Sequence, residues 1–140
     1  MKENVDKICV VIRIYRISRW CYKHHLTILS RLFYAVNYIL FSCVIPPSAE
    51  LGDNVNIAHG IGIVIHHKAV IGENTKIYQN VTIGGGTRYI GRDCYIGTGA
   101  VVLADIGDNV KIGANAVVTK PIPSGKTAVG VPARIMNEHD

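Results

Sequence analysis

The chain has 140 residues, of which 49% are hydrophobic and 18% are charged. This composition is typical of one globular domain and excludes a disordered chain. The formal net charge of +5 favours an anionic ligand. We find no basic stripe interleaved with aromatic residues, so the sequence predicts no nucleic-acid binding.

The first 45 residues are predicted to be helical. Val10, Ile14 and Ile17 recur at helical spacing and predict a helix over about residues 4–22. A second, largely apolar helix is predicted over about residues 26–43, and Pro46 and Pro47 prevent its continuation. Its length is near that of a membrane span, but the internal Arg31 argues against spanning. A buried or interfacial helix is preferred, and membrane contact by residues 26–43 stays the less favoured alternative.

The cysteines carry no metal or disulfide signature. Their spacing gives no CxxC pair, no zinc pattern and no disulfide framework. We therefore expect free thiols, no metal site and a reducing, cytoplasmic location. No signal-peptide pattern is found at the start of the sequence.

A repeat with a period of six begins after Pro47. An aliphatic residue recurs, mostly every six positions, from Leu51 to Val118. Glycine usually follows it, then a residue that tolerates positive φ, and then a small or β-branched residue. Such a unit forms one face of a triangular coil, and three units make a turn. The sequence thus predicts a mainly β fold, a parallel β-helix of nearly four turns, whose handedness the period leaves open.

The repeat also divides the chain. We expect a helical segment over residues 1–45, a β-helix over 46–123 and a tail over 124–140. Cys94 occupies a small inward position of the repeat and is predicted to pack in the core rather than react.

Breaks in the period mark candidate sites, because loops on a rigid scaffold commonly carry function. The step from Ile57 to Ile65 is eight residues long and contains Ala58 and His59. The step from Ile83 to Ile90 is seven residues long and contains a glycine run. That run lacks the spacing and the following helix of a dinucleotide-binding loop, so it predicts a tight corner or a close approach to a ligand.

Four stretches resemble the serine acetyltransferases, a family of hexapeptide-repeat acyltransferases. They are residues 47–64, residues 69–85, the closing run 128–135 and the helical run Tyr15–Trp20. The resemblance covers about residues 10–136. It implies a left-handed coil, acetyl-CoA as co-substrate, and a homotrimer whose sites lie between subunits.

The resemblance also implies roles for particular residues. His59 falls at the catalytic histidine and would act as general base on an acceptor hydroxyl. Ala58, Arg88 and Tyr89 fall at the acceptor side of the site. The residues expected to bind acetyl-CoA are Gly84, Gly85, Lys111, Ala114, Lys120, Lys126 and Arg134.

The chain departs from the family at the acceptor side. Val44 stands where the family has the aspartate that pairs with its histidine, and Ala58 replaces an acidic residue that contacts serine. Asp53 or a backbone carbonyl is the alternative orienting group for His59. The preferred function is therefore O-acetyl transfer to a hydroxyl of a sugar or polysaccharide precursor. Serine O-acetylation and a non-catalytic β-helix scaffold are the alternatives.

Overall fold

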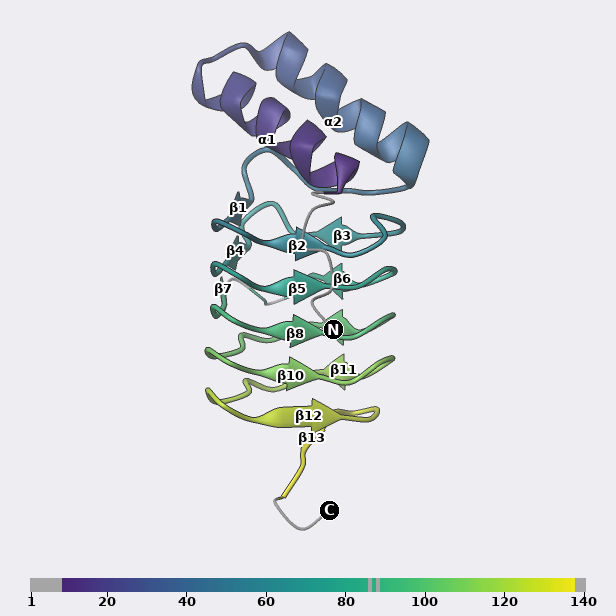
Figure 1. Ribbon diagram of the computed structural model, residues 1–140, viewed down its shortest axis with the longest axis vertical. Helices are drawn as coiled ribbons and strands as arrows, with labels where there is room; N and C mark the ends of the chain where they lie inside the picture. Colours follow the sequence, from purple (N-terminus) through teal and green to yellow (C-terminus); the bar gives the residue numbers. More distant parts are fainter. Residues whose placement is uncertain (1–8, 86, 88, 138–140) are drawn as a thin grey trace, which may run out of the picture.

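The computed structural model describes residues 9–85, 87 and 89–137. Two helices, α1 (Val10–Lys23) and α2 (Thr27–Phe41), stand on one end of a left-handed β-helix of about four turns (Figure 1). The predicted fold is confirmed. The second helix ends at Phe41, ahead of the two prolines, where Ser42 adopts the left-handed conformation with φ 53°. The predicted start of the first helix, at residue 4, lies outside the described residues.

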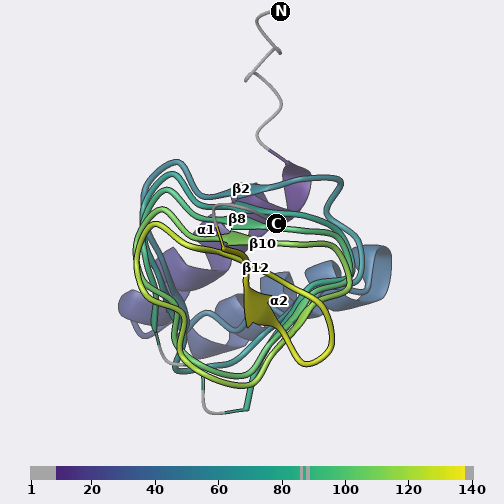
Figure 2. The ribbon, with the colours of Figure 1, turned by 90° about the horizontal axis from the view of Figure 1, so that it is seen from below.

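The coil consists of short strands that pair from turn to turn. The strands are β1 (Glu50–Leu51), β2 (Asn56–Ile57), β3 (Val64–Ile65), β4 (Val70–Ile71), β5 (Lys76–Ile77), β6 (Thr82–Ile83), β7 (Tyr89–Ile90), β8 (Tyr95–Ile96), β9 (Val101–Val102), β10 (Lys111–Ile112), β11 (Val117–Val118), β12 (Thr127–Val129) and β13 (Arg134–Ile135). They form three sheets, in the orders β1-β4-β7, β13-β12-β10-β8-β5-β2 and β11-β9-β6-β3. All pairs are parallel except β12 with β13. Viewed along its axis, the coil is a rounded triangle (Figure 2).

The aliphatic repeat residues form the core. Ile57, Ile77, Ile96 and Ile112 occupy successive rungs of one sheet, and all four are fully buried. Several corners of the coil turn at single residues with positive φ, where asparagine adopts the left-handed region at low cost. The predicted corner residues Asn54, Asn74, Asn80, Asp93, Gly99, Asn109 and Asn115 all have φ between 54° and 69°.

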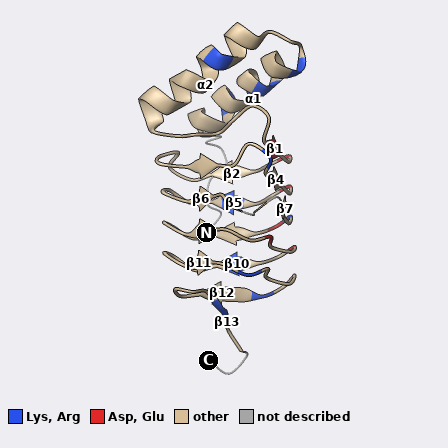
Figure 3. Ribbon diagram, turned by 180° about the vertical axis from the view of Figure 1, so that it is seen from behind, with Lys and Arg blue, Asp and Glu red and all other residues tan. Residues whose placement is uncertain are grey.

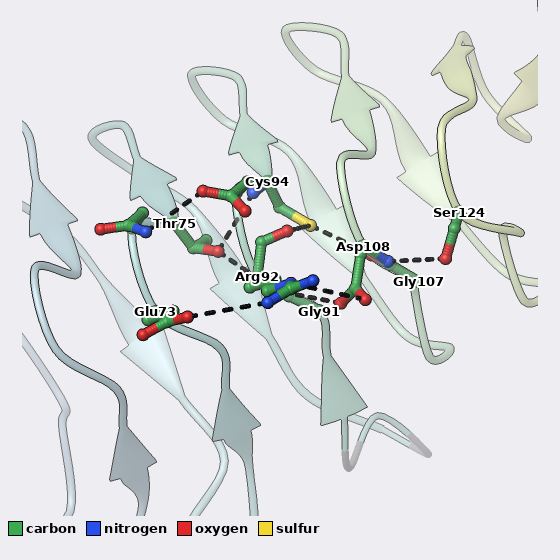
Figure 4. Close-up of polar contacts among 10 residues, drawn as sticks. Glu73, Thr75, Gly91, Arg92, Cys94, Gly107, Asp108 and Ser124 are labelled. Atoms are coloured by element: carbon green, nitrogen blue, oxygen red, sulfur yellow. Dashed lines mark hydrogen bonds and ion pairs between the residues drawn. The ribbon is translucent and has the colours of Figure 1, made fainter.

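Polar side chains link the turns along one corner (Figure 4). Thr75 Oγ1 donates a hydrogen bond to the Gly91 carbonyl at 2.9 Å, and the Arg92 amide donates to Asp108 Oδ1 at 2.9 Å. The Cys94 thiol donates to the Gly107 carbonyl at 3.1 Å, and burial raises its pKa. Cys94 therefore packs in the core as predicted.

Helix α1 is fixed to the coil through carbonyl groups near β1. The buried Tyr15 hydroxyl donates to the Ala49 carbonyl at 2.6 Å, and burial raises the pKa of this phenol. The Arg16 guanidinium donates to the Leu51 carbonyl at 2.7 Å, and the Arg19 guanidinium donates to the Ala49 carbonyl at 2.8 Å. In Figure 1, α1 lies between α2 and the first turn of the coil, so α2 is the outermost element at this end.

Candidate active site

His59 lies in the long corner between β2 and β3. Three residues there have positive φ, namely His59 at 67°, Gly60 at 59° and Gly62 at 65°, whereas the corner between β5 and β6 on the next turn has one, Asn80. Positive φ is costly for a histidine and persists only where the surroundings hold the backbone in place. The eight-residue step of the sequence is therefore a bulged corner that carries an exposed His59.

The two glycines of this corner are held by neighbouring segments. A Cβ atom at Gly60 would overlap the side chains of Cys9 and Val11, at the start of α1. A Cβ atom at Gly62 would overlap the Asn80 side chain on the next turn of the coil. The Gly62 amide also donates to the Phe41 carbonyl at 3.2 Å. Both helices and the second turn thus position the loop that presents His59.

An aromatic pair borders His59 on the surface. The Tyr78 ring lies 6.4 Å from the His59 ring, and the Tyr95 ring lies 5.0 Å from Tyr78, measured between centroids. The Lys76 ammonium stands 5.0 Å from the Tyr78 ring centroid. A hydrogen bond between the two tyrosine side chains is the main cause that raises the pKa of Tyr95. The surroundings of His59 therefore combine two aromatic rings with a cation.

The predicted orienting groups do not contact His59. Val44 is half-buried and pairs with Val64, so the position of the family aspartate is apolar and lies in a β-bridge. Asp53 is exposed at the corner that precedes β2, and no hydrogen bond joins it to His59. Among the described residues, the His59 imidazole makes a ring contact with Tyr78 and no hydrogen bond or ion pair.

The residues predicted to bind acetyl-CoA fall into two groups. Ala114 follows Ile112 as His59 follows Ile57, so both residues lie at the same corner, three rungs apart. Lys111 on β10 and Arg134 on β13 belong to the sheet that contains β2, and Lys126 precedes β12 of that sheet. Gly84, Gly85 and Lys120 follow strands β6 and β11, at the next corner. Within one chain, only one group, Lys111, Ala114, Lys126 and Arg134, lies along the sheet and corner that lead to His59.

The acceptor-side residues are also separated. Ala58 is half-buried beside His59, and its amide donates to the Ile77 carbonyl at 2.8 Å. Tyr89 lies on β7, in the sheet β1-β4-β7, and its amide donates to Asp105 Oδ1 at 2.9 Å. Arg88 lies outside the described residues. One chain therefore does not bring Tyr89 to His59.

In the part of the chain that the structure describes, no other histidine has a ring contact with His59. The His66 and His67 rings are 4.3 Å apart at the corner after β3, and His66 Nδ1 accepts a hydrogen bond from the Lys68 amide at 3.2 Å. Within residues 9–85, 87 and 89–137, no three His, Cys, Asp or Glu side chains are placed to hold a metal ion.

The sequence analysis missed Lys76, Tyr78 and Tyr95. A signal was present, because Tyr78 follows Ile77 in the repeat as Ala58 follows Ile57. Residues at equal positions of consecutive turns are neighbours on the surface of a solenoid. Aligning the repeats around His59 would therefore have identified Tyr78.

Comparison with known proteins places this geometry in one family. Residues 89–120 match the bacterial transferase hexapeptide (six repeats) family. The chain is 37% identical over 131 residues to the serine acetyltransferase of Synechococcus elongatus, which covers 87% of this chain and 54% of that protein. It is also 37% identical over 133 residues to the serine acetyltransferase of Helicobacter pylori, which covers 89% of this chain and 78% of that protein.

Solved structures agree with the sequence comparison. A serine acetyltransferase in complex with CoA superposes with a TM-score of 0.85 at 35% identity, over 90% of this chain and 55% of that one. The chain thus spans little more than half the length of some relatives, and the shared part is the coil with the two helices before it. Because the likeness extends over the helices, the coil and the bulged corner of His59, the chain belongs to the serine acetyltransferase family.

Proposed function

We propose that this chain transfers an acetyl group from acetyl-CoA to a hydroxyl group, with His59 as the general base and serine as the acceptor. One observation carries the proposal: a serine acetyltransferase matches 89% of this chain, and the chain holds an exposed histidine in a left-handed backbone conformation at a bulged corner of the coil. The named relatives are serine acetyltransferases, and this supports serine over the sugar acceptor that the sequence analysis preferred.

His59 would hold and move the proton. A neutral imidazole accepts the proton of the acceptor hydroxyl, and the imidazolium then returns a proton to the departing thiolate. Acetyl-CoA supplies an activated thioester for this exchange. Lys111, Lys126 and Arg134 lie on the sheet that leads to His59 and are the cations suited to its phosphates.

The site is proposed to be shared between subunits of a homotrimer. His59 lies at one corner of the coil, whereas Tyr89 and Gly85 lie on another sheet and at another corner. Three copies around an axis would bring the His59 corner of one chain against a different face of the next. Sedimentation should give a trimer, and a monomer with full activity would contradict the shared site. The free thiols of the described chain fit the proposed cytoplasmic location.

A sugar hydroxyl is the second candidate acceptor. Ala58 supplies no charge for the ammonium group of serine, and the tilted rings of Tyr78 and Tyr95 lie beside His59. Aromatic rings of this kind pack against the C–H face of a pyranose.

The test is thioester loss from acetyl-CoA, measured with serine and with a panel of sugars. His59→Ala should lower turnover by roughly 10²–10⁴-fold if His59 is the base. His24→Ala is the matched control, because this exposed histidine lies at the end of α1, whereas the start of α1 contacts the His59 corner. Turnover on sugars alone would reject the serine assignment. A His59→Ala rate equal to that of wild type would remove His59 from the mechanism.

A further inference from the structure

Helix α2 buries two polar residues and exposes large aliphatic ones. Ser30 and Asn37 are buried, at 2% and 1% exposure. Ile28 and Ile39, by contrast, are 86% and 74% exposed. A helix on the surface of a soluble domain normally turns its apolar stripe inward. The apolar side of α2 is therefore left uncovered by residues 9–85, 87 and 89–137.

The contact between the helices is polar and close. The Ser18 and Ser30 hydroxyls each donate to the other residue's carbonyl at 2.9 Å, and Asn37 Nδ2 donates to the Val11 carbonyl at 3.1 Å. Small and polar residues between helices, with aliphatic residues facing outward, are typical of helices packed in lipid. Within the helix pair, the aliphatic residues exposed on α2 are Ile28, Leu29, Leu32, Ile39 and Leu40. We call these five residues the outer face of α2.

The charge of the chain is concentrated in the same region. Residues 9–49 contain five Lys and Arg and no Asp or Glu, so this segment carries the entire formal net charge of +5. Figure 3 shows basic but no acidic residues on the two helices, whereas acidic residues lie along the coil. Arg13, Lys23 and Arg31 are exposed, and none of their side chains forms a hydrogen bond or ion pair with another described residue. These three cations are free to meet an anionic surface.

We propose that the outer face of α2 binds the surface of an anionic lipid bilayer, with Arg13, Lys23 and Arg31 contacting the headgroups. Aliphatic residues flanked by cations and by exposed aromatic rings bind at the boundary between headgroups and acyl chains. Trp20, Tyr22 and Tyr38 are exposed aromatic residues of the same helix pair.

The helix would lie on the membrane and not cross it. Its 15 residues span about 22 Å, which is shorter than the ~30 Å hydrocarbon core. None of the described helices has the length and apolarity needed to cross a bilayer. A shallow hollow lined by His25, Leu26, Thr27, Ile28, Leu29 and Leu32 lies at the start of this helix and continues its apolar surface.

A second copy of the chain fits this face less well. Two such helix pairs would bring together segments that each carry a net charge of +5, and like charges across an interface are unfavourable. A bilayer of anionic lipids supplies both the apolar covering and the opposite charge. Charge complementarity therefore selects the membrane as the occupant.

The test is flotation of the full chain with vesicles of equal parts phosphatidylcholine and phosphatidylglycerol, compared with vesicles of phosphatidylcholine alone. The chain should bind the anionic vesicles at low salt, and binding should weaken when the ionic strength rises from about 0.1 M to about 1 M. The double variant Ile28→Asp/Ile39→Asp should lose at least tenfold in vesicle affinity. Val131→Asp is the matched control, because Val131 is 71% exposed and follows β12, at the far end of the coil. It should bind as wild type does.

A charge variant separates the two contributions. Arg13→Glu/Lys23→Glu/Arg31→Glu should weaken binding to anionic vesicles by roughly a hundredfold or more, since each cation near such a surface contributes about fivefold. Circular dichroism and sedimentation would establish that each variant is folded. Equal binding to both vesicle types would overturn the proposal, as would no binding by the wild-type chain. Self-association lost in Ile28→Asp/Ile39→Asp, without vesicle binding, would assign the outer face to a second copy instead. None of these results depends on acetyl transfer, so failure here leaves the proposed function untouched.

Discussion

Replacing Gly62 by alanine tests how the His59 corner is held. Gly62 has φ 65°, a conformation that costs an L-residue about 1–2 kcal/mol. The added Cβ would also overlap Asn80 Oδ1, so the Asn80 side chain must move aside. A side chain held off its rotamer costs about 0.5–1.5 kcal/mol, so Gly62→Ala should lower the free energy of unfolding by roughly 1.5–3.5 kcal/mol.

A second glycine separates the two costs. Gly125 has φ 76°, and a Cβ atom there would meet nothing within 4 Å. Gly125→Ala should therefore cost only the backbone contribution of about 1–2 kcal/mol. In an Asn80→Gly background the overlap is absent, and Gly62→Ala should cost no more than Gly125→Ala does.

Urea unfolding of Gly62→Ala, Gly125→Ala, Asn80→Gly and the double variant measures the differences in the free energy of unfolding. The thioester assay measures how far each substitution lowers the turnover that depends on His59. Misplacement of a catalytic group by about 1 Å can cost up to ~10²-fold in rate. Turnover should thus fall in Gly62→Ala and recover in part in the double variant. Equal stability losses for Gly62→Ala and Gly125→Ala would refute the contact with Asn80.

Three further predictions concern the core, the helix attachment and the acceptor. Ile83→Ala removes a fully buried side chain from the column of repeats and should lower the free energy of unfolding by about 2–5 kcal/mol, measured by urea unfolding. Tyr15→Phe removes one of the two donors to the Ala49 carbonyl, together with the oxygen that accepts from the Leu51 amide, and should cost about 1–3 kcal/mol, measured in the same way. Because burial raises the pKa of Tyr15 above its usual 10.0, the folded state retains this proton longer than the unfolded state. The stability from the neutral phenol is complete below pH 10.0 and is lost as the pH rises through the folded-state pKa, so Tyr15→Phe should flatten the alkaline decline in melting temperature. Ala58→Asp restores an acidic residue beside His59 and should lower the KM for serine, and an unchanged KM would count against serine as the acceptor.

The sequence alone determined the coil. A period of six with an aliphatic residue, a corner residue and a small residue leaves few other folds, because each repeat buries its apolar side chain only against its neighbours. It therefore predicted the buried isoleucines, the positive φ at Asn54 and Asn74, and the inward position of Cys94. The eight-residue step likewise located the bulge at His59, since an extra length of chain in a regular coil must project from it.

Only the tertiary structure decided what surrounds that bulge. The contacts of His59 with Tyr78, and of Gly60 with Cys9, join segments far apart in the chain and depend on the stacking of turns and on the path of the helices. The periodicity of α2 showed an apolar helix but not which side faces the protein. Ser30 and Asn37 are buried against α1, where their side chains donate to the Ser18 and Val11 carbonyls, and this packing leaves the aliphatic side facing outward.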